Sequence, residues 1–387
     1  MTNDSNKTMK LENNSIDMLN FLRVAATVFV FVLHGRSYVE GVDNGFWLFA
    51  MLTNFPAWAG VWILFFLSGY LLQKGFLKNR YPIYENGKLR PKALLSFYVK
   101  RFMKIAPAYY VYLLLFVVIR GDDYFFSSPL TALKILTFTF NGTGGISGIG
   151  HLWYISVAMW FYVLAPFFYH VISKIKSTKG LGVSFAVLTC VGLIIRIALS
   201  YTELSWYDYT YTFLPCNIDL FCGGMLACSL TERISAARKD GKFRTLKLTS
   251  LLAFASVFVF NTYVYWKEIY HVYQNIMPTV YIISCAFLLW IFDSELCSRP
   301  KPTLSAIKKN PLRLIDRFSP ITYAFYIFHI VVFKYVTAVL MLWSAYAGFS
   351  VYLRYTIFMI LSFVLSLLMG ILFTKMISVF GRSKKNA

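Results

Sequence analysis

Long apolar stretches, separated by short polar segments, run through almost the whole of this 387-residue chain. Because the hydrocarbon core of a bilayer is about 30 Å thick, a helix that crosses it needs about 20 mostly apolar residues. The pattern predicts an all-α bundle of ten transmembrane helices, a polytopic membrane domain at 19–378 between tails at 1–18 and 379–387. The predicted spans are residues 19–39, 46–73, 101–119, 151–172, 181–200, 209–230, 249–266, 275–293, 318–343 and 353–378.

Basic residues are concentrated in alternate segments between the predicted spans. With the N-terminal tail in the cytoplasm, the cytoplasmic segments are 74–100, 173–180, 231–248, 294–317 and the C-terminal tail. Lys and Arg accumulate in cytoplasmic loops, and the links after spans 1, 5 and 9 contain neither. The sequence thus predicts a multi-pass protein of the cell (plasma or inner) membrane with both tails cytoplasmic. The basic residues include Lys88, Arg90, Lys92, Lys174, Lys176, Lys179, Arg238, Lys239, Lys242, Arg244, Lys308, Lys309, Arg313, Arg382, Lys384 and Lys385, and the outer links carry Glu40, Asp43, Glu203 and Asp208.

Composition agrees with this pattern, since 58% of residues are hydrophobic, 14% are charged and the mean hydropathy is +0.59. Soluble domains carry about 25% charged residues, so an ordinary soluble globule is excluded. The net charge of +21 follows from the basic loops and requires no nucleic acid partner. The six cysteines form no C-x-x-C pair and have no histidine at ligand spacing, so neither disulfides nor a metal site is indicated.

The segment between the third and fourth spans differs from the other links. It opens with Asp122 and Asp123, passes through a moderately apolar stretch at 129–140 and ends in a glycine-rich strip at 141–150. Because it is too short for a full span with loops, we expect a helix at the outer surface or dipping part-way into the bilayer. A flexible strip would follow it.

Ionisable residues within a span are costly and are functional candidates by default. Arg23 and His34 are 11 residues apart in the first span, which places both side chains on one helix face, about 16 Å apart along the axis. This arrangement suits a long anionic ligand that enters from the cytoplasm. Alternatively, Arg23 reaches lipid phosphate and His34 bonds a neighbouring helix. Asp219 and Lys334 are expected to pair with each other or with Arg196 in structural roles.

Several short motifs occur in a fixed order along the chain, and the set is more specific than any member. The motifs are Arg23-x10-His34, Phe65-Phe-Leu-Ser-Gly-Tyr-Leu71, Lys100-Arg-Phe-Met-Lys-Ile-Ala-Pro-Ala-Tyr109, His151-Leu-Trp-Tyr-Ile155 with Phe161-Tyr162, and Tyr323-Ala-Phe-Tyr-Ile-Phe-His329. In this order, and over most of its length, the sequence resembles the acyltransferase-3 family of integral membrane acyltransferases.

The resemblance implies transfer of an acyl group, usually acetyl, from cytosolic acyl-CoA to a hydroxyl of an extracytoplasmic cell-surface glycan or lipid-linked sugar. It assigns a catalytic role to His34 and Arg23, and acyl-CoA binding to Arg101, Lys104 and Arg23. Lys104 replaces an arginine of the family pattern, which keeps the charge but loses a planar fork for bidentate phosphate contact. Acyl-CoA would be a donor substrate, and no tightly bound cofactor is expected.

A second departure follows the His-Leu-Trp motif, where many members have a glutamate and this chain reads Ser156-Val-Ala-Met-Trp160. No carboxylate role can therefore be transferred to this position. Some members also carry an extracytoplasmic SGNH hydrolase-like domain. Because only nine residues follow the last predicted span, we expect the stand-alone membrane form.

The residues themselves suggest how the chemistry is divided. His34 is a candidate general base for the acceptor hydroxyl, because imidazole has the unperturbed pKa nearest neutrality. Transient acylation of His34 is the competing role. His151 and Trp153, at the outer end of the fourth span, are candidates for acceptor recognition, although Trp153 equally fits an interfacial aromatic belt. His329, with Tyr326, either lines the same cavity or bonds only within the bundle.

Two other classes of function remain open at this point. An exporter or flippase of a polysaccharide or lipid-linked sugar would also need intramembrane charges and a polar cavity. The basic pair Arg101 and Lys104 and the same-face pair Arg23 and His34 favour the enzyme, because a flippase needs neither specifically. A sensor or scaffold is weaker, since we expect no appended soluble domain large enough to signal. Acyl-CoA, a glycan acceptor and membrane lipids are the expected partners.

Overall fold

The computed structural model describes residues 17–42, 58–120, 128–140, 148–202, 213–236, 244–269, 271–292 and 314–383. Within these residues, ten helical segments are long and apolar enough to cross a membrane, and each overlaps one predicted span. The all-α polytopic bundle is thereby confirmed. The long helices are α2 (Met18–Arg36), α4 (Ala59–Leu77), α5 (Pro91–Arg120), α8 (Trp153–Ser173), α9 (Thr178–Leu199), α10 (Leu214–Ala236), α11 (Arg244–Trp266), α12 (Met277–Phe292), α15 (Thr322–Met341) and α16 (Val351–Ser383).

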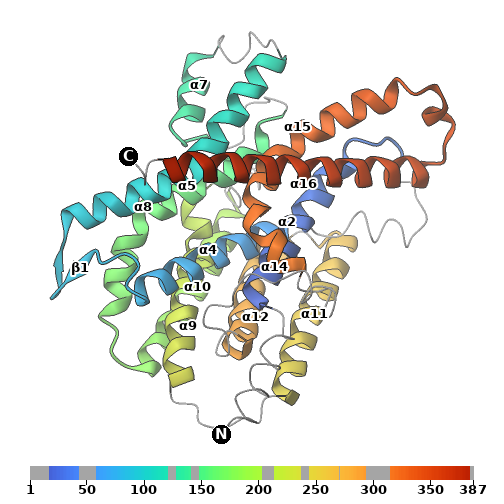
Figure 1. Cartoon of the computed structure of the whole chain (residues 1–387). Helices are drawn as coiled ribbons and strands as arrows, with labels where there is room; N and C mark the ends of the chain where they lie inside the picture. Colours follow the sequence, from blue (N-terminus) through green and yellow to red (C-terminus); the bar gives the residue numbers. More distant parts are fainter. Residues whose placement is uncertain are drawn as a thin grey trace, which may run out of the picture.

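Short elements lie between the long helices of the described chain. The antiparallel strands β1 and β2 form a small hairpin between α4 and α5, at the left edge of Figure 1. Elements α14 and η7 precede α15 and complete the ninth span. The short elements are β1 (Tyr84–Glu85), β2 (Lys88–Leu89), α7 (Pro129–Leu136), η2 (Gly150–Leu152), the π-helix η4 (Val272–Ile276), α14 (Leu314–Phe318), η7 (Ser319–Ile321) and η8 (Ser344–Gly348).

The third span departs most clearly from its predicted bounds, because α5 begins at Pro91 rather than near residue 101. Proline suits the first turn of a helix, where its missing N–H is not needed. Lys92 and Lys100, in these early turns, are exposed. The helix therefore extends beyond its apolar portion, which a hydropathy pattern alone does not detect.

The predicted helix in the outer segment is present as α7 (Pro129–Leu136). Leu130 and Leu133 on this helix are exposed, and two tyrosines of α5 secure its end. The Tyr109 hydroxyl donates to the Ile135 carbonyl at 2.7 Å, and that of Tyr110 to the Leu136 carbonyl at 2.8 Å. Asp122, Asp123 and residues 141–147 of the glycine-rich strip lie outside the described residues.

Helices α4 and α10 cross in close contact at the centre of the bundle (Figure 1). A β-carbon on Gly69 would lie 1.9 Å from the backbone oxygen of Phe221, and one on Gly224 would lie 2.0 Å from that of Phe66. Both distances are shorter than any real contact, so this crossing requires glycine on each helix. Small residues permit such close approach between membrane helices.

An ion pair lies within the bundle between α9 and α10. Both side chains of Arg196 and Asp219 are fully buried, and the guanidinium donates to the two carboxylate oxygens at 2.9 Å and 2.7 Å. The same guanidinium also donates to the Thr279 hydroxyl and to the Asn275 and Cys216 carbonyls. Of the predicted pairings, the one between Asp219 and Arg196 is therefore formed.

Lys334 stands apart from this pair. Its amino group lies 5.7 Å from the centroid of the Phe116 ring, beside Gly148.

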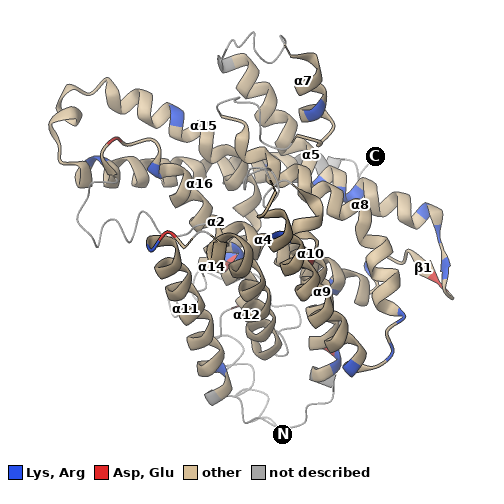
Figure 2. Ribbon diagram, turned by 180° about the vertical axis from the view of Figure 1, so that it is seen from behind, with Lys and Arg blue, Asp and Glu red and all other residues tan. Residues whose placement is uncertain are grey.

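Many charged residues of the described chain lie at helix ends and in the hairpin (Figure 2). Several residues on which the predicted orientation depends lie outside the described residues or have undescribed side chains, so both cytoplasmic tails remain a prediction. They are Asp43, Glu203, Asp208, Arg238, Lys239, Lys242, Arg244, Lys308, Lys309, Arg313, Arg382, Lys384 and Lys385.

Candidate functional site

A cavity of about 540 Å³ lies between α2, α4, α5, α8 and the η7–α15 segment. It is lined by apolar side chains, by tyrosines and by four basic residues. No Asp or Glu is present among the described residues that line it. A volume of this size is typical of a small-molecule site. The four basic residues are Arg23, Arg80, Arg101 and Lys104, called here the cavity cations.

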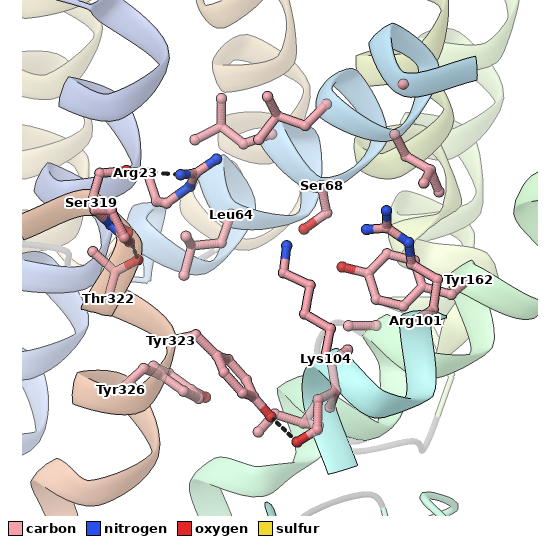
Figure 3. A pocket seen from close by; sticks show the side chains of 18 of the residues that line it. Arg23, Leu64, Ser68, Arg101, Lys104, Tyr162, Ser319, Thr322, Tyr323 and Tyr326 are labelled. Carbon is pink, nitrogen blue, oxygen red and sulfur yellow. Dashed lines mark hydrogen bonds between the residues drawn. The ribbon is translucent and has the colours of Figure 1, made fainter. Parts of the chain in front are cut away.

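Each cavity cation comes from a different position in the fold, except for two on α5. Arg23 lies near the start of α2, and its Nη1 donates to the Ser319 hydroxyl at 2.7 Å. Arg80 follows α4 in the turn that leads to the hairpin. Lys104 extends into the cavity from α5 towards Ser68 of α4 (Figure 3). Among the described residues, no carboxylate lies within ion-pair distance of any of them.

Arg101 is held by aromatic rings. Its guanidinium carbon lies 4.8 Å from the ring centroid of Tyr81, and 5.8 Å from those of Phe97 and Tyr162. Cation–π contacts of this kind position a guanidinium without neutralising it. Its Nε is buried and has no hydrogen-bond partner. The full charge of Arg101 thus remains available at the cavity.

Three histidines from three helical segments meet next to the cavity, and we call them the histidine cluster. Nδ1 of His34 lies 2.8 Å from Nε2 of His329, and the two ring planes are 21° apart. His151 stands roughly perpendicular to both, with ring centroids 6.4 Å from His34 and 5.4 Å from His329. His151 and His329 are buried, whereas His34 is only partly buried. The sequence marks each of the three as a site candidate, but it does not predict that their rings meet.

Backbone carbonyls bind the buried members of the cluster. Nε2 of His151 donates to the Ile327 carbonyl at 3.1 Å, and Nδ1 of His329 donates to the Tyr326 carbonyl. Nδ1 of His151 is buried and has no hydrogen-bond partner. Each of these two rings therefore carries its proton on the nitrogen that faces a carbonyl, because a carbonyl oxygen can only accept.

Tyr326 forms the boundary between the cavity and the histidine cluster. It lines the cavity, and its hydroxyl donates to the His151 carbonyl at 2.6 Å. Its ring centroid lies 5.8 Å from that of His151 and 5.7 Å from that of His329. None of the three histidines lines the cavity itself. The two sites are thus adjacent but separated by one side chain.

The structure brings together most of the residues singled out in the sequence. Arg23 contacts η7 and His34 contacts α15, so both face the same neighbouring segment, as their spacing predicts. Trp153 does not line the cavity; it is buried, with its ring centroid 6.1 Å from that of Phe65. An interfacial position for Trp153 stays a prediction.

Sequence reasoning missed Arg80 and four tyrosines of the lining, namely Tyr81, Tyr154, Tyr162 and Tyr323. Asn79, with φ of 52°, turns the chain so that Arg80 reaches the cavity, and no motif marks this turn. Tyr162 and Tyr323 lie within motifs noted above, yet their pattern does not distinguish a cavity residue from a core residue. The Tyr323 hydroxyl donates to the Ile105 carbonyl at 2.8 Å, which links α15 to α5 beside Lys104 (Figure 3).

Known proteins with similar sequences indicate the family of the chain. The chain is 28% identical over 207 residues to Nodulation protein 10 of Rhizobium leguminosarum bv. viciae, covering 48% of this chain and 52% of that protein. The chain thus spans about half the length of this curated relative. No solved structure matches. A family model described as an acyltransferase domain matches residues 16–372, which include the cavity and the histidine cluster. This multi-pass membrane protein therefore belongs to the acyltransferase-3 family.

Proposed function

We propose that the protein transfers an acyl group, acetyl in the simplest case, from acyl-CoA to a hydroxyl of a cell-surface glycan or lipid-linked sugar. The observation that carries this proposal is the adjacency of a cationic cavity, without a carboxylate in its described lining, and a histidine cluster. The donor would bind in the cavity, and the chemistry would take place at His34.

The charge of the cavity suits the donor. Coenzyme A carries a pyrophosphate and a 3′-phosphate, and it is therefore strongly anionic at neutral pH. Charge-assisted hydrogen bonds from Lys and Arg to phosphate are among the strongest in proteins. Arg23, Arg80, Arg101 and Lys104 all line the cavity, where they would hold the phosphates. The pantetheine arm would then extend past Tyr326 towards His34.

His34 is the group that we assign to proton transfer. As general base, its imidazole takes the proton of the acceptor hydroxyl while that oxygen attacks the thioester carbonyl. The carbon–sulfur bond breaks, and the same proton passes to the coenzyme A sulfur, which leaves as a thiol. The products are an O-acyl ester and free coenzyme A. No further reactant is required.

The two substrates would approach from opposite sides. His34 lies eleven residues beyond Arg23 on α2, and it keeps partial exposure although it does not line the cavity. The basic hairpin with Lys88 and Arg90 directly follows Arg80, which supports a cytoplasmic position for the donor entrance. The acceptor hydroxyl would therefore meet His34 from the extracytoplasmic side.

The test is binding of radiolabelled acetyl-CoA to the protein in nanodiscs, with coenzyme A as competitor. Lys104→Met removes a cavity cation, and Lys100→Met is the matched control because Lys100 lies on the same helix, is exposed and does not line the cavity. Loss of one charge-assisted contact is expected to weaken binding by about tenfold or more. The control should bind like the wild type.

Two outcomes would contradict this assignment. Equal affinity of Lys104→Met and the wild type would return Lys104 to a topological role. No binding by folded wild-type protein, with other short acyl-CoA donors also failing, would favour the exporter instead.

A second experiment tests the role of His34. His34→Ala should bind acetyl-CoA normally and transfer no acetyl group. Protein incubated with radiolabelled acetyl-CoA without acceptor should carry no label on His34. A labelled His34 peptide would instead establish the acyl-histidine route.

A further inference from the structure

We infer that His329 is a positioning residue that fixes the protonation pattern of His34, so that Nε2 of His34 carries the free lone pair that acts as base. This inference rests on the proposed function for its catalytic meaning. The protonation pattern itself follows from a chain of hydrogen bonds that begins at a backbone carbonyl.

The series of hydrogen bonds begins at the Tyr326 carbonyl, which can only accept a hydrogen bond. Because Nδ1 of His329 contacts this oxygen, Nδ1 carries the proton of that ring. His329 is 1% exposed, and the titratable groups that face it from the described chain are His34, His151 and Tyr326, none of them a carboxylate. Its other ring contacts, Phe31 and Phe333, are apolar. A buried imidazole without an anionic partner stays neutral. Nε2 of His329 is then an acceptor.

The next step fixes His34. Its Nδ1 lies 2.8 Å from Nε2 of His329, and the ring centroids are 5.0 Å apart with the planes 21° apart. This geometry places the contact close to the plane of both rings, where an N–H and a nitrogen lone pair meet. Since Nε2 of His329 accepts, Nδ1 of His34 must donate. The neutral His34 ring therefore has an unprotonated Nε2.

His151 does not disturb this pattern. Its Nε2–H is used on the Ile327 carbonyl, so it has no proton to offer His34 or His329. Among the described residues, no donor is bonded to Nε2 of His34, and this ring is the partly exposed member of the cluster. The free lone pair thus lies on the one histidine that a substrate hydroxyl can reach.

His329 has the role that an acidic residue has in hydrolase triads, where it orients the catalytic histidine. In those triads the wrong histidine tautomer lowers turnover severely. Here a neutral imidazole takes that role, and a backbone carbonyl fixes the imidazole in turn. The consequence is specific: His329 contributes to turnover through His34 without touching the donor.

Two nearly isosteric variants separate this role from packing. In His329→Gln, the side-chain amide is long enough to reach the position of Nε2, so its oxygen can accept from His34. Its NH2 group can at the same time donate to the Tyr326 carbonyl. In His329→Asn, the side chain is one methylene shorter and cannot do both. We expect His329→Gln to keep kcat within about threefold and His329→Asn to lose at least about tenfold, with the KM for acetyl-CoA unchanged in both.

The kinetic assay uses proteoliposomes, acetyl-CoA and a de-O-acetylated envelope polysaccharide as acceptor, with thiol release as the signal. Size-exclusion chromatography and acetyl-CoA binding verify that both variants are folded. A parallel measurement records ¹⁵N NMR spectra of histidine-labelled protein in liposomes, where the chain's five histidines keep the assignment tractable. His34 should carry its proton on Nδ1 in the wild type and in His329→Gln, and shift towards Nε2 in His329→Asn.

Two results would overturn the inference. One is a wild-type His34 protonated on Nε2, and the other is equal kcat in His329→Asn and His329→Gln. The NMR result does not depend on turnover. If acetyl-CoA fails to bind, the proposed function is wrong while the protonation pattern is still decided by NMR.

Discussion

The bundle contains two groups of charged residues at membrane depth, and they are built in opposite ways. Arg196 and Asp219 are fully buried and form a bidentate ion pair whose remaining donors are also satisfied. Arg23, Arg101 and Lys104 are cations without a described carboxylate partner, and they face a cavity. In the first group, the charges and the hydrogen-bond donors are all satisfied by protein atoms. The second leaves positive charge available to a ligand.

This difference shows how to interpret an ionisable residue in a membrane span. Arg23, Arg196 and Asp219 are equally conspicuous in the sequence, because each interrupts an apolar stretch. The distinction lies in the partners. A charge with a matched counterion and full hydrogen bonding stabilises the fold, whereas charges of one sign around a cavity indicate an anionic ligand.

The largest effect on stability is expected from breaking the buried pair. Asp219→Ala leaves the Arg196 guanidinium buried without a counterion, which costs about 3–5 kcal/mol. The thermal unfolding midpoint in detergent should fall sharply, or little folded protein should be recovered. The double variant Arg196→Met with Asp219→Leu should recover most of the loss, because no unpaired charge remains. An unchanged midpoint for Asp219→Ala would show that the pair is not structural.

A smaller effect is expected from crowding the same pair without removing a charge. A β-carbon on Gly192 would lie 2.2 Å from the Asp219 carboxylate, so Gly192→Ala should displace it, with a cost of about 1–3 kcal/mol typical of overpacking. Gly182→Ala is the matched control, since it lies on the same helix and a β-carbon there meets nothing within 4 Å. Equal midpoints for the two variants would contradict a tightly fitted pair.

The sequence predicts well those features that depend on the bilayer or on local periodicity. All ten spans follow from the length needed to cross the membrane, and the common face of Arg23 and His34 follows from helix geometry. The early start of α5 at Pro91 is missed because those turns leave the apolar region. Lys334 and Arg196 are both possible partners for Asp219, and only the packing of α9 on α10 selects Arg196.

The contents of the site depend on contacts between distant segments. His34 and His329 are 295 positions apart, and no pattern in either span indicates that their rings share a hydrogen bond. Arg80 is brought to the cavity by a turn with positive φ at Asn79, a local feature that carries no motif. Trp153 lies two positions after the motif histidine His151, yet its side chain packs on Phe65 instead of entering the cavity. Tertiary packing decides the histidine contact and the position of Trp153, and an unmarked local turn decides the position of Arg80.

The smallest effect on stability is expected at the cavity. Lys104→Met removes a cation that has no described carboxylate partner, so its loss strands no opposite charge and relieves repulsion with Arg23 and Arg101. Its unfolding midpoint should match that of Lys100→Met, with a change within about 0.5 kcal/mol, although the affinity for acetyl-CoA falls. Loss of a charge from the buried ion pair would thus lower stability, whereas loss of a cavity cation would lower the affinity for acetyl-CoA and leave stability unchanged. A loss of stability like that of Asp219→Ala would mean that Lys104 is a structural charge, and the contrast between the two groups would fail.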